Sequence, residues 1–440
     1  MTKKANNEVI SAKYVIIGNS AGAIGCVEGI RRADSQGEIL LLADEPYHTY
    51  SRPLISYLLL GRTDEQRMKY RPDDFYTANQ VQTRLGADAK VTEIDVAAHQ
   101  AVLADGTQVK YEKLLAATGS LPFVPPTKGL DSVKNCFTFM SLDDAKGLAQ
   151  AITPESRVLV VGAGLIGLKC VEGIAERVKQ ITVVDLADRI LSSILNAEAA
   201  AVVQRYLEKR GIQFILGDCV AEFKKNSAVL QNSAQKLDFD VLVMAVGVRP
   251  NTALLTAAGA ESDRGVLVDA HCQTSLADVY AAGDCTQGYD VVSGEQKILA
   301  LLPNAYMQGE CAGANMAGQP EEYKTGLALN SIGFWGKHIM SAGVYQGEAL
   351  VQADEENYKC LFVQDGLLMG YILVGDVARA GIYTNLVRSR QPLAEVDWQL
   401  LQLKPQLMAF SQEARKQKLS SRPVGQQQNA QNLELKGDRA

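Results

Sequence analysis

The feature that most constrains this chain is a glycine-rich stretch that separates two apolar runs near the middle of the sequence. The first run, residues 157–161, leads directly into Gly162, Gly164 and Gly167. A helical pattern follows, and a second apolar run ends in Asp185. This order predicts a βαβ unit in which the glycines let the backbone approach a pyrophosphate at the positive end of a helix. We therefore expect a bound dinucleotide.

The acid at the end of the second run predicts the kind of dinucleotide. A carboxylate there accepts a hydrogen bond from the 2′-hydroxyl of an adenosine ribose and repels a 2′-phosphate, so Asp185 favours NADH over NADPH. Glycines alone also mark ordinary turns, but here the strands, the helix and the acid all occur in the expected order. The expected cofactor contacts in this loop are Gly162, Gly164, Leu165, Ile166 and Gly167.

A second and looser fingerprint lies near the N-terminus. Residues 13–17 predict a buried strand, a helix follows as far as Arg32, and residues 39–42 predict the next strand. Ser20 and Ala23 stand where the second and third glycines would be, which the pattern accepts. Two such units predict two dinucleotides. The expected contacts in this unit are Gly18, Ser20, Ala21, Gly22 and Ala23.

Polar or small residues after other predicted strands offer further contacts. Asp44 or Glu45 is placed to hold a ribose, and the planar cation of Arg52, followed by Pro53, suits a pyrophosphate. A solvated loop is the alternative for this segment. For Asp284, which follows a predicted strand, an ordinary helix N-cap is the alternative. The small-residue loops at strand ends contain Thr118, Gly119, Gly247, Gly283 and Asp284.

Length and composition bound the remaining possibilities. A chain of 440 residues with 47% hydrophobic and 21% charged residues predicts a soluble enzyme of two or three domains. A net charge of −6 gives no indication of a positively charged surface that would bind nucleic acid or an anionic membrane. The sequence has no apolar run of membrane-spanning length and no signal peptide, so we expect a cytoplasmic protein. Its eight cysteines form no CxxC pair, and we expect no metal site.

Five motifs in one order resemble those of the FAD-dependent pyridine nucleotide-disulfide oxidoreductases, over about residues 10–405. They are the loop at Gly18, Ala117-Thr118-Gly119, the loop at Gly162, Ala245 to Asn251, and Ala282-Gly283-Asp284. The resemblance implies an α/β chain with two Rossmann-like domains, one for FAD and one for NAD(H), and a C-terminal α+β interface domain. The implied ranges are 10–125 with 250–322 for FAD, 126–249 for NAD(H) and 323–405 for the interface domain.

The resemblance also implies roles for single residues. Asp284 would hold the FAD ribityl chain, Asp44 or Glu45 its ribose, and the N-terminal glycines its pyrophosphate. The interface domain would lie against the flavin of its own or a partner subunit, which is compatible with a homodimer. Trp335 in that domain would either shield the flavin or fill the core. Residues 406–440, polar and rich in Gln and Asn towards the end, predict a disordered tail.

Two departures from the family pattern narrow the expected activity. Relatives that reduce disulfides or peroxide, or oxidise NADH, carry a redox cysteine near Arg52, but no cysteine lies between Cys26 and Cys136. The Arg52-Pro53-Leu54 segment is instead similar to ferredoxin and rubredoxin reductases, and to the NADH oxidoreductases that accompany carbon monoxide dehydrogenases. We therefore expect an NADH oxidoreductase that exchanges electrons with a ferredoxin or rubredoxin. The alternatives are an NADH oxidase, a thiol-disulfide reductase or an NADH-sensing flavoprotein scaffold.

The second departure concerns a charged pair. Relatives often carry a lysine five residues after the arginine and a glutamate two residues after the last glycine of the NAD(H) loop. Here these positions are Tyr57 and Lys169. We expect Lys169, with Tyr57 beside it, to stabilise reduced flavin at its N5 edge. The alternative is that the Lys169 side chain extends into solvent.

Overall fold

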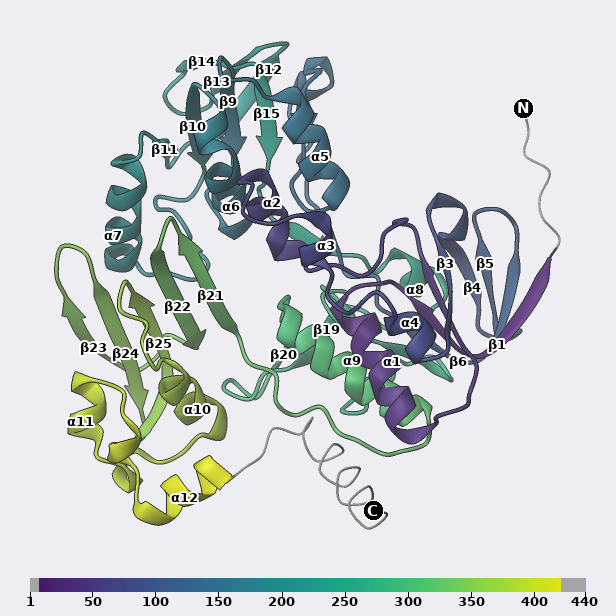
Figure 1. The fold of residues 1–440 in the computed structure, drawn as a ribbon. Helices are drawn as coiled ribbons and strands as arrows, with labels where there is room; N and C mark the ends of the chain where they lie inside the picture. Colours follow the sequence, from purple (N-terminus) through teal and green to yellow (C-terminus); the bar gives the residue numbers. More distant parts are fainter. Residues whose placement is uncertain (1–7, 421–440) are drawn as a thin grey trace, which may run out of the picture.

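The computed structural model describes residues 8–420, which build three large sheets (Figure 1). The N-terminal sheet has seven strands, in the order β3-β2-β1-β6-β5-β4, with β18 pairing to β6. Its β1, β2, β3, β6 and β18 pair in parallel, as the first fingerprint requires. The strands are β1 (Val9–Ile17), β2 (Ile39–Ala43), β3 (Val81–Leu85), β4 (Val91–Asp95), β5 (Gln100–Leu103), β6 (Gln108–Ala116) and β18 (Val279–Ala281).

The middle sheet is fully parallel, with five strands in the order β11-β10-β9-β15-β8. Helices α5 (Leu142–Ala151), α6 (Leu165–Ile174) and α7 (Ala197–Glu208) belong to this part of the chain. Its strands are β8 (Cys136–Phe137), β9 (Arg157–Val161), β10 (Gln180–Asp185), β11 (Gln213–Leu216) and β15 (Val241–Met244). A small antiparallel sheet adjoins it, made of β12 (Val220–Lys224), β13 (Ser227–Leu230) and β14 (Lys236–Asp238).

The C-terminal sheet is antiparallel, in the order β21-β22-β25-β24-β23. Its strands are β21 (Leu329–Phe334), β22 (Lys337–Gly343), β23 (Glu348–Ala353), β24 (Tyr358–Gln364) and β25 (Leu367–Val374), followed by α10 (Gly381–Ser389) and α11 (Trp398–Leu403). The structure differs from the predicted disordered tail up to Ser420, because α12 (Gln412–Ser420) is helical. The rest of that tail lies outside the described residues.

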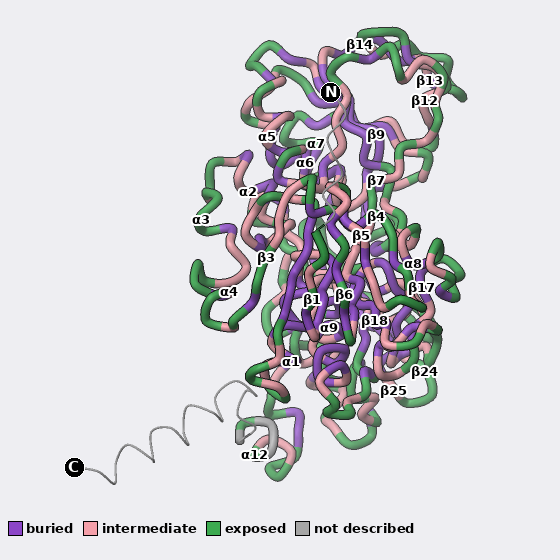
Figure 2. The backbone as a smooth tube through the Cα atoms, turned by 90° about the vertical axis from the view of Figure 1, so that its right-hand side faces the viewer, coloured by how far each residue is buried: buried purple, intermediate pink, exposed green. Residues whose placement is uncertain are grey.

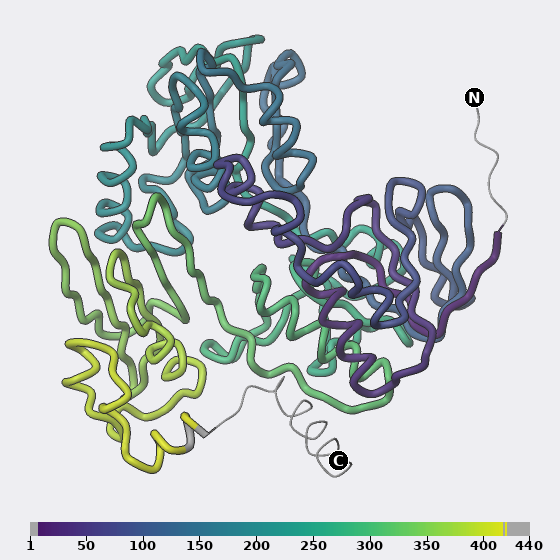
Figure 3. The backbone as a smooth tube through the Cα atoms, in the orientation of Figure 1, coloured from purple at the N-terminus to yellow at the C-terminus, as the bar shows by residue number. Residues whose placement is uncertain are grey.

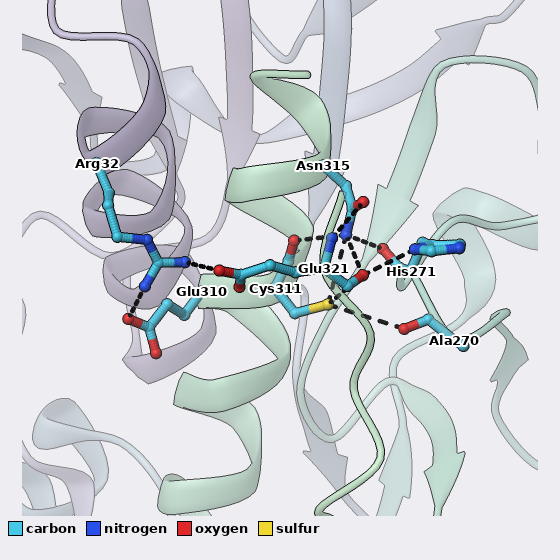
Figure 4. Close-up of polar contacts among 7 residues, drawn as sticks. All are labelled: Arg32, Ala270, His271, Glu310, Cys311, Asn315 and Glu321. Carbon is cyan, nitrogen blue, oxygen red and sulfur yellow. Dashed lines mark hydrogen bonds and ion pairs between the residues drawn. The ribbon is translucent and has the colours of Figure 1, made fainter. Parts of the chain in front are cut away.

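A helix pair covers one side of the N-terminal sheet, whose strands β1 and β6 are buried towards their C-terminal ends (Figure 2). Helices α1 (Ala21–Ala33) and α9 (Leu302–Met316) approach so closely that a Cβ at Gly309 would lie 1.9 Å from the Gly22 carbonyl oxygen. Only glycine fits such a crossing. At the far end of the pair Arg32 bridges Glu310 and Glu321, at 2.7 Å each, and the Asn315 amide donates to the Glu321 carbonyl (Figure 4).

One N-terminal segment leaves its own sheet and packs elsewhere (Figure 3). Helix α2 (Ile55–Leu59) lies against α6, where Arg177 donates to the Leu59 carbonyl and Gly173 faces the Leu59 side chain. Tyr50, Ile55, Leu59 and Met68 share one apolar core with the middle sheet and with β21, β22, β24 and β25. This segment, which the predicted division places in the FAD-binding range, therefore packs against the middle sheet's helices. The reason is that its apolar side chains face the helices of the middle sheet.

The two nucleotide-type sheets are joined by a short antiparallel ladder. Strand β7 (Ser120–Pro122) pairs with β16 (Val248–Pro250). The remaining short elements are α3 (Glu65–Met68), α4 (Phe75–Ala78), α8 (Ala253–Ala257), β17 (Val266–Leu267), β19 (Thr286–Tyr289) and β20 (Gln296–Lys297). None of the helices among residues 8–420 is long and apolar enough to cross a membrane.

Candidate cofactor site

Both glycine fingerprints form the tight strand-to-helix turn that the sequence predicts. Gly18 and Gly162 each have φ of +115°, where a side chain is strained. A Cβ at Gly18 would lie 2.3 Å from the Ala117 carbonyl oxygen, and one at Gly162 would lie 2.2 Å from that of Ala245. Each first glycine therefore lets its turn pass directly over a neighbouring strand end.

The helices after these turns start without a side-chain cap. Helix α1 begins after Ser20, whose side chain makes no capping hydrogen bond, and α6 begins after Gly164, which has no side chain to make one. By contrast Ser141 caps α5 and Asn196 caps α7. The first turns of α1 and α6 hold no acidic residue, so their N–H donors and positive helix ends fit a pyrophosphate.

The middle loop also leaves room for a ligand backbone, because a Cβ at Gly164 would meet nothing within 4 Å. Gly167 provides the close helix packing, since a Cβ there would lie 2.0 Å from the Gly162 carbonyl oxygen. Leu165 and Ile166 form the first turn of α6 and are partly buried. In the N-terminal loop the corresponding residues Ala21, Gly22 and Ala23 are buried in the first turn of α1.

Asp185 lies at the end of β10, next to the glycine loop. One carboxylate oxygen accepts the N–H of Ala163 at 2.6 Å, and the other accepts the N–H of Ala187 at 2.8 Å. The acid therefore fixes the loop as well as standing at the position predicted for ribose recognition. The exposed Leu186 and Asp188 lie beside it.

The acids after β2 divide into two kinds. Asp44 is exposed and Glu45 is drawn inward, where it pairs with Arg52 and accepts the Tyr50 hydroxyl at 2.7 Å. Arg52 also donates to Tyr50 at 3.2 Å and to the Met140 carbonyl at 3.3 Å. The structure thus brings the predicted Glu45 and Arg52 together through Tyr50. Pro53 is exposed in the short 3-10 helix that Arg52 begins.

The two small-residue loops at the domain crossing lie side by side. The Thr118 hydroxyl donates to the Asn251 carbonyl at 2.7 Å, and the Asn251 N–H donates to the Gly119 carbonyl at 2.9 Å. A Cβ at either Gly119 or Gly247 would meet nothing within 4 Å, and both glycines have positive φ. The backbone on this side is therefore open to a ligand.

Asp284 lies between the N-terminal sheet and this crossing. The Ser120 hydroxyl donates to its carboxylate at 3.1 Å. Burial raises the pKa of Asp284, while the Ser120 hydrogen bond and the charge of Arg52 oppose that rise. The helix-cap alternative for Asp284 is wrong, because the next element is strand β19. Beside it the Gly283 N–H donates to the buried Gln308 side chain at 2.8 Å.

Lys169 lies on the second turn of α6 with little exposure. Its ammonium group pairs with Glu172, donates to the Gly333 carbonyl at 3.2 Å and stands 4.5 Å from the centroid of the Tyr57 ring. The expected neighbour Tyr57 is therefore in place. The solvent-extended alternative is wrong, because the Lys169 side chain is 16% exposed.

Sequence reasoning missed three groups that complete these sites. Tyr50, Ser120 and Glu172 each bind a predicted charged residue directly. Tyr50 and Ser120 lie within two residues of Arg52 and Thr118 in the sequence. A hydroxyl residue that close to a predicted contact could have identified them. Glu172, three residues after Lys169, stands at a spacing where helix side chains meet.

The cysteines that follow Lys169 and Asp284 in the sequence are inaccessible. Cys170 and Cys285 are both fully buried, and burial raises the pKa of each thiol. All eight cysteines are free thiols. Among residues 8–420, no three His, Cys, Asp or Glu side chains are grouped so as to hold a metal ion.

Two glycine-loop helices on two sheets, joined by one crossing, define a class of oxidoreductase that binds two dinucleotides. Residues 12–309 match the pyridine nucleotide-disulphide oxidoreductase family, and residues 325–391 match the rubredoxin NAD+ reductase C-terminal domain. The chain belongs to the pyridine nucleotide-disulphide oxidoreductase family. It is an oxidoreductase whose cofactors are FAD and NAD(H).

Individual relatives align along nearly the whole chain. A subunit epsilon of NADH-dependent phenylglyoxylate dehydrogenase from Aromatoleum evansii is 32% identical, with 87% of this chain and 92% of the relative covered. A ferredoxin–NAD(+) reductase component of 3-phenylpropionate/cinnamic acid dioxygenase from Photorhabdus laumondii is 28% identical, covering 88% and 98%. The putidaredoxin reductase–putidaredoxin complex has the same fold, with a TM-score of 0.81 at 22% identity, covering 89% and 95%.

Proposed function

We propose that this chain passes electrons between NAD(H) and a small iron-sulfur protein of the ferredoxin or rubredoxin type, by way of FAD. FAD, when bound, takes up electrons in pairs from NADH and can release them singly. The observation that carries the proposal is a charged lysine on the helix that follows the middle glycine loop, with the neighbouring thiols buried. The relatives described above, and the rubredoxin NAD+ reductase domain, support a protein acceptor.

The residues divide between the two cofactors. We assign FAD to the N-terminal unit: the loop from Gly18 to Ala23, Thr118, Gly119, Gly283 and Asp284, with Glu45 and Arg52 at the adenosine and pyrophosphate end. NAD(H) is assigned to the loop from Gly162 to Gly167, to Gly247 and to Asp185. The uncapped helices α1 and α6 would each donate N–H groups to one pyrophosphate.

Lys169 and Tyr57 are the residues we assign to the reacting edge of the flavin. The ammonium group lies against the Tyr57 ring and is held in a largely buried place, so its charge is only weakly screened. A positive charge there would favour the more negative, reduced form of the cofactor.

We also propose which kind of iron-sulfur protein is the partner. The relative from Aromatoleum evansii is named as a subunit of an NADH-dependent dehydrogenase. We propose by analogy that the partner here is an iron-sulfur protein or subunit of a larger oxidoreductase, such as a carbon monoxide dehydrogenase system, and that the working form is a homodimer. An NADH oxidase or a thiol-disulfide reductase is the alternative, and it is disfavoured by the burial of Cys170 and Cys285.

Electron transfer to a purified protein acceptor tests this proposal. The FAD-loaded enzyme is reduced anaerobically with NADH and mixed with excess ferredoxin or rubredoxin, and the visible band of the acceptor is followed. We expect many turnovers per enzyme, at a rate well above that with oxygen or a small disulfide. Turnover with oxygen or disulfide alone would refute the proposed acceptor class. Lys169→Met should slow the reduction by NADH, with Lys179→Met, an exposed lysine of the same domain, as the control.

A further inference from the structure

The turn between β21 and β22 reaches from the C-terminal sheet into the helices of the middle sheet. Trp335 forms this turn in the left-handed region, with φ of +44°. Its N–H donates to the Glu172 carboxylate of α6 at 2.8 Å, and its carbonyl accepts the Tyr206 hydroxyl of α7 at 2.8 Å. Both backbone hydrogen-bonding groups of Trp335 are therefore bound by side chains of α6 and α7.

The same carboxylate holds Lys169. One Glu172 oxygen takes the Lys169 ammonium group and the other takes the Trp335 amide. The Glu172 side chain is 2% exposed, so both contacts lie in a weakly screened environment. Lys169 also donates to Gly333 and lies 5.6 Å from the Phe334 ring, both just before the turn. Lysine, glutamate and turn thus form a single packed unit.

Two cationic side chains pack against the Tyr206 ring. The Arg210 guanidinium lies 3.7 Å from the centroid of the Tyr206 ring and 5.7 Å from that of Trp335, and the Lys337 ammonium lies 5.0 Å from the Tyr206 ring. The Arg210 guanidinium also donates to the Tyr206 hydroxyl at 2.7 Å. These contacts hold the hydroxyl that binds Trp335 in a fixed direction.

We propose that Glu172 is a positioning residue that fixes the Lys169 charge with one oxygen and anchors the Trp335 turn of the C-terminal domain with the other. The inference rests on the proposed role of Lys169. Through Glu172, the helix that follows the NAD(H) loop is mechanically tied to the C-terminal domain. The charge beside the flavin and the seating of that domain therefore depend on the same carboxylate.

Two substitutions at Glu172 separate its two tasks. Glu172→Gln keeps a hydrogen-bonding group but removes the negative charge that offsets Lys169. We expect the ratio of reduced to oxidised FAD, at a fixed NADH/NAD+ ratio, to rise about tenfold, which corresponds to one pKa unit of interaction. Glu172→Ala removes the anchor as well. Acrylamide quenching of Trp335 fluorescence should then rise about twofold, because the turn opens locally.

Matched variants complete the experiment, which uses the FAD-loaded protein throughout. Trp335 and Trp398 are the two tryptophans, so quenching is measured in a Trp398→Phe background. Glu176→Gln, an exposed acid just after α6, is the control for charge and should change neither readout. Tyr206→Phe should raise the quenching without reproducing the tenfold shift in FAD ratio. Thermal unfolding verifies that each variant is folded.

The outcomes distinguish the anchoring of the Trp335 turn by Glu172 from the effect of Glu172 on Lys169 and the flavin. Wild-type quenching in folded Glu172→Ala would refute the anchor. An unchanged FAD ratio in Glu172→Gln, where Lys169→Met does change the ratio, would refute the control of Lys169 by Glu172. If Lys169→Met also leaves the ratio unchanged, the proposed role of Lys169 fails and the flavin part of the inference fails with it. The quenching data still decide the anchor in that case.

Discussion

The N-terminal and middle glycine loops share one backbone geometry but are supported by different surroundings. Helix α1 is buried along most of its length, and its glycines Gly25 and Gly29 lie against the backbone of α9. Helix α6 carries a buried ion pair and meets α2 and the C-terminal turn. The comparison teaches that one fingerprint is packed against a second helix of its own domain, with backbone in close contact with backbone. The other is packed against two segments from other parts of the chain, α2 and the turn between β21 and β22.

The acids of the two units show the opposite arrangement, because here the N-terminal acid has the contacts with a distant segment. Asp185 binds the amides of its own loop and of the residue that follows Leu186. Glu45 is instead held by Arg52 and Tyr50, and both of these also contact the segment that leads into α5. The acid of the N-terminal unit is therefore tied by side chains to the segment that leads into α5, whereas Asp185 contacts only backbone amides close to its own loop.

The largest expected effect comes from forcing α1 and α9 apart. Gly309→Ala places a Cβ 1.9 Å from the backbone oxygen of Gly22, so the two helices must separate. We expect a loss of about 3 kcal/mol in the free energy of unfolding and poor retention of FAD. Chemical denaturation and the visible spectrum of the purified protein measure both. Gly164→Ala is the matched variant, because its Cβ meets open space; it should unfold like wild type and raise the KM for NADH.

An intermediate effect sharpens the cofactor assignment of the middle unit. Asp185→Ser removes a charge that would repel a 2′-phosphate. We expect the preference for NADH over NADPH, measured as the ratio of kcat/KM values, to fall about tenfold. Asp188→Ser, whose carboxylate is 80% exposed, controls for the change in net charge. An unchanged preference in Asp185→Ser would place ribose recognition elsewhere.

The smallest expected effect comes from substituting the serine before the capped helix α5 and the serine before the uncapped helix α1. Ser141 caps α5 with its side chain, so Ser141→Ala should cost about 1 kcal/mol in the free energy of unfolding. Ser20 precedes α1 without capping it, so Ser20→Ala should leave the stability of the apoprotein unchanged and weaken the retention of FAD. Equal losses of stability in the two apoproteins would contradict the view that the α1 N-terminus is kept free for a phosphate.

The sequence predicted the regular parts of this molecule well, because their causes are local. The strand, glycine turn and helix at residues 157–174 follow from periodicity and from the conformational freedom of glycine, and the observed elements begin and end close to the predicted positions. The second apolar run, predicted to end in Asp185, is likewise strand β10, which ends at that residue.

The parts that the sequence did not predict depend on contacts between distant segments. The packing of α2 on α6 requires apolar residues more than a hundred positions apart to meet, and no local pattern encodes that. The Glu172 contact with Trp335 joins residues 163 positions apart. For the same reason the contacts of Glu45 with Arg52 and Tyr50 are seen only in the folded structure.

An anaerobic titration of the FAD-loaded protein with NADH tests the central claim most directly. Since the cysteines near the proposed flavin site are buried, NADH should be consumed at about one equivalent per FAD, with no long-wavelength band from a thiolate in contact with the flavin. Uptake of two equivalents, accompanied by such a band, would show that a cysteine takes part in the electron path. That result would contradict the account and indicate a disulfide or peroxide reductase.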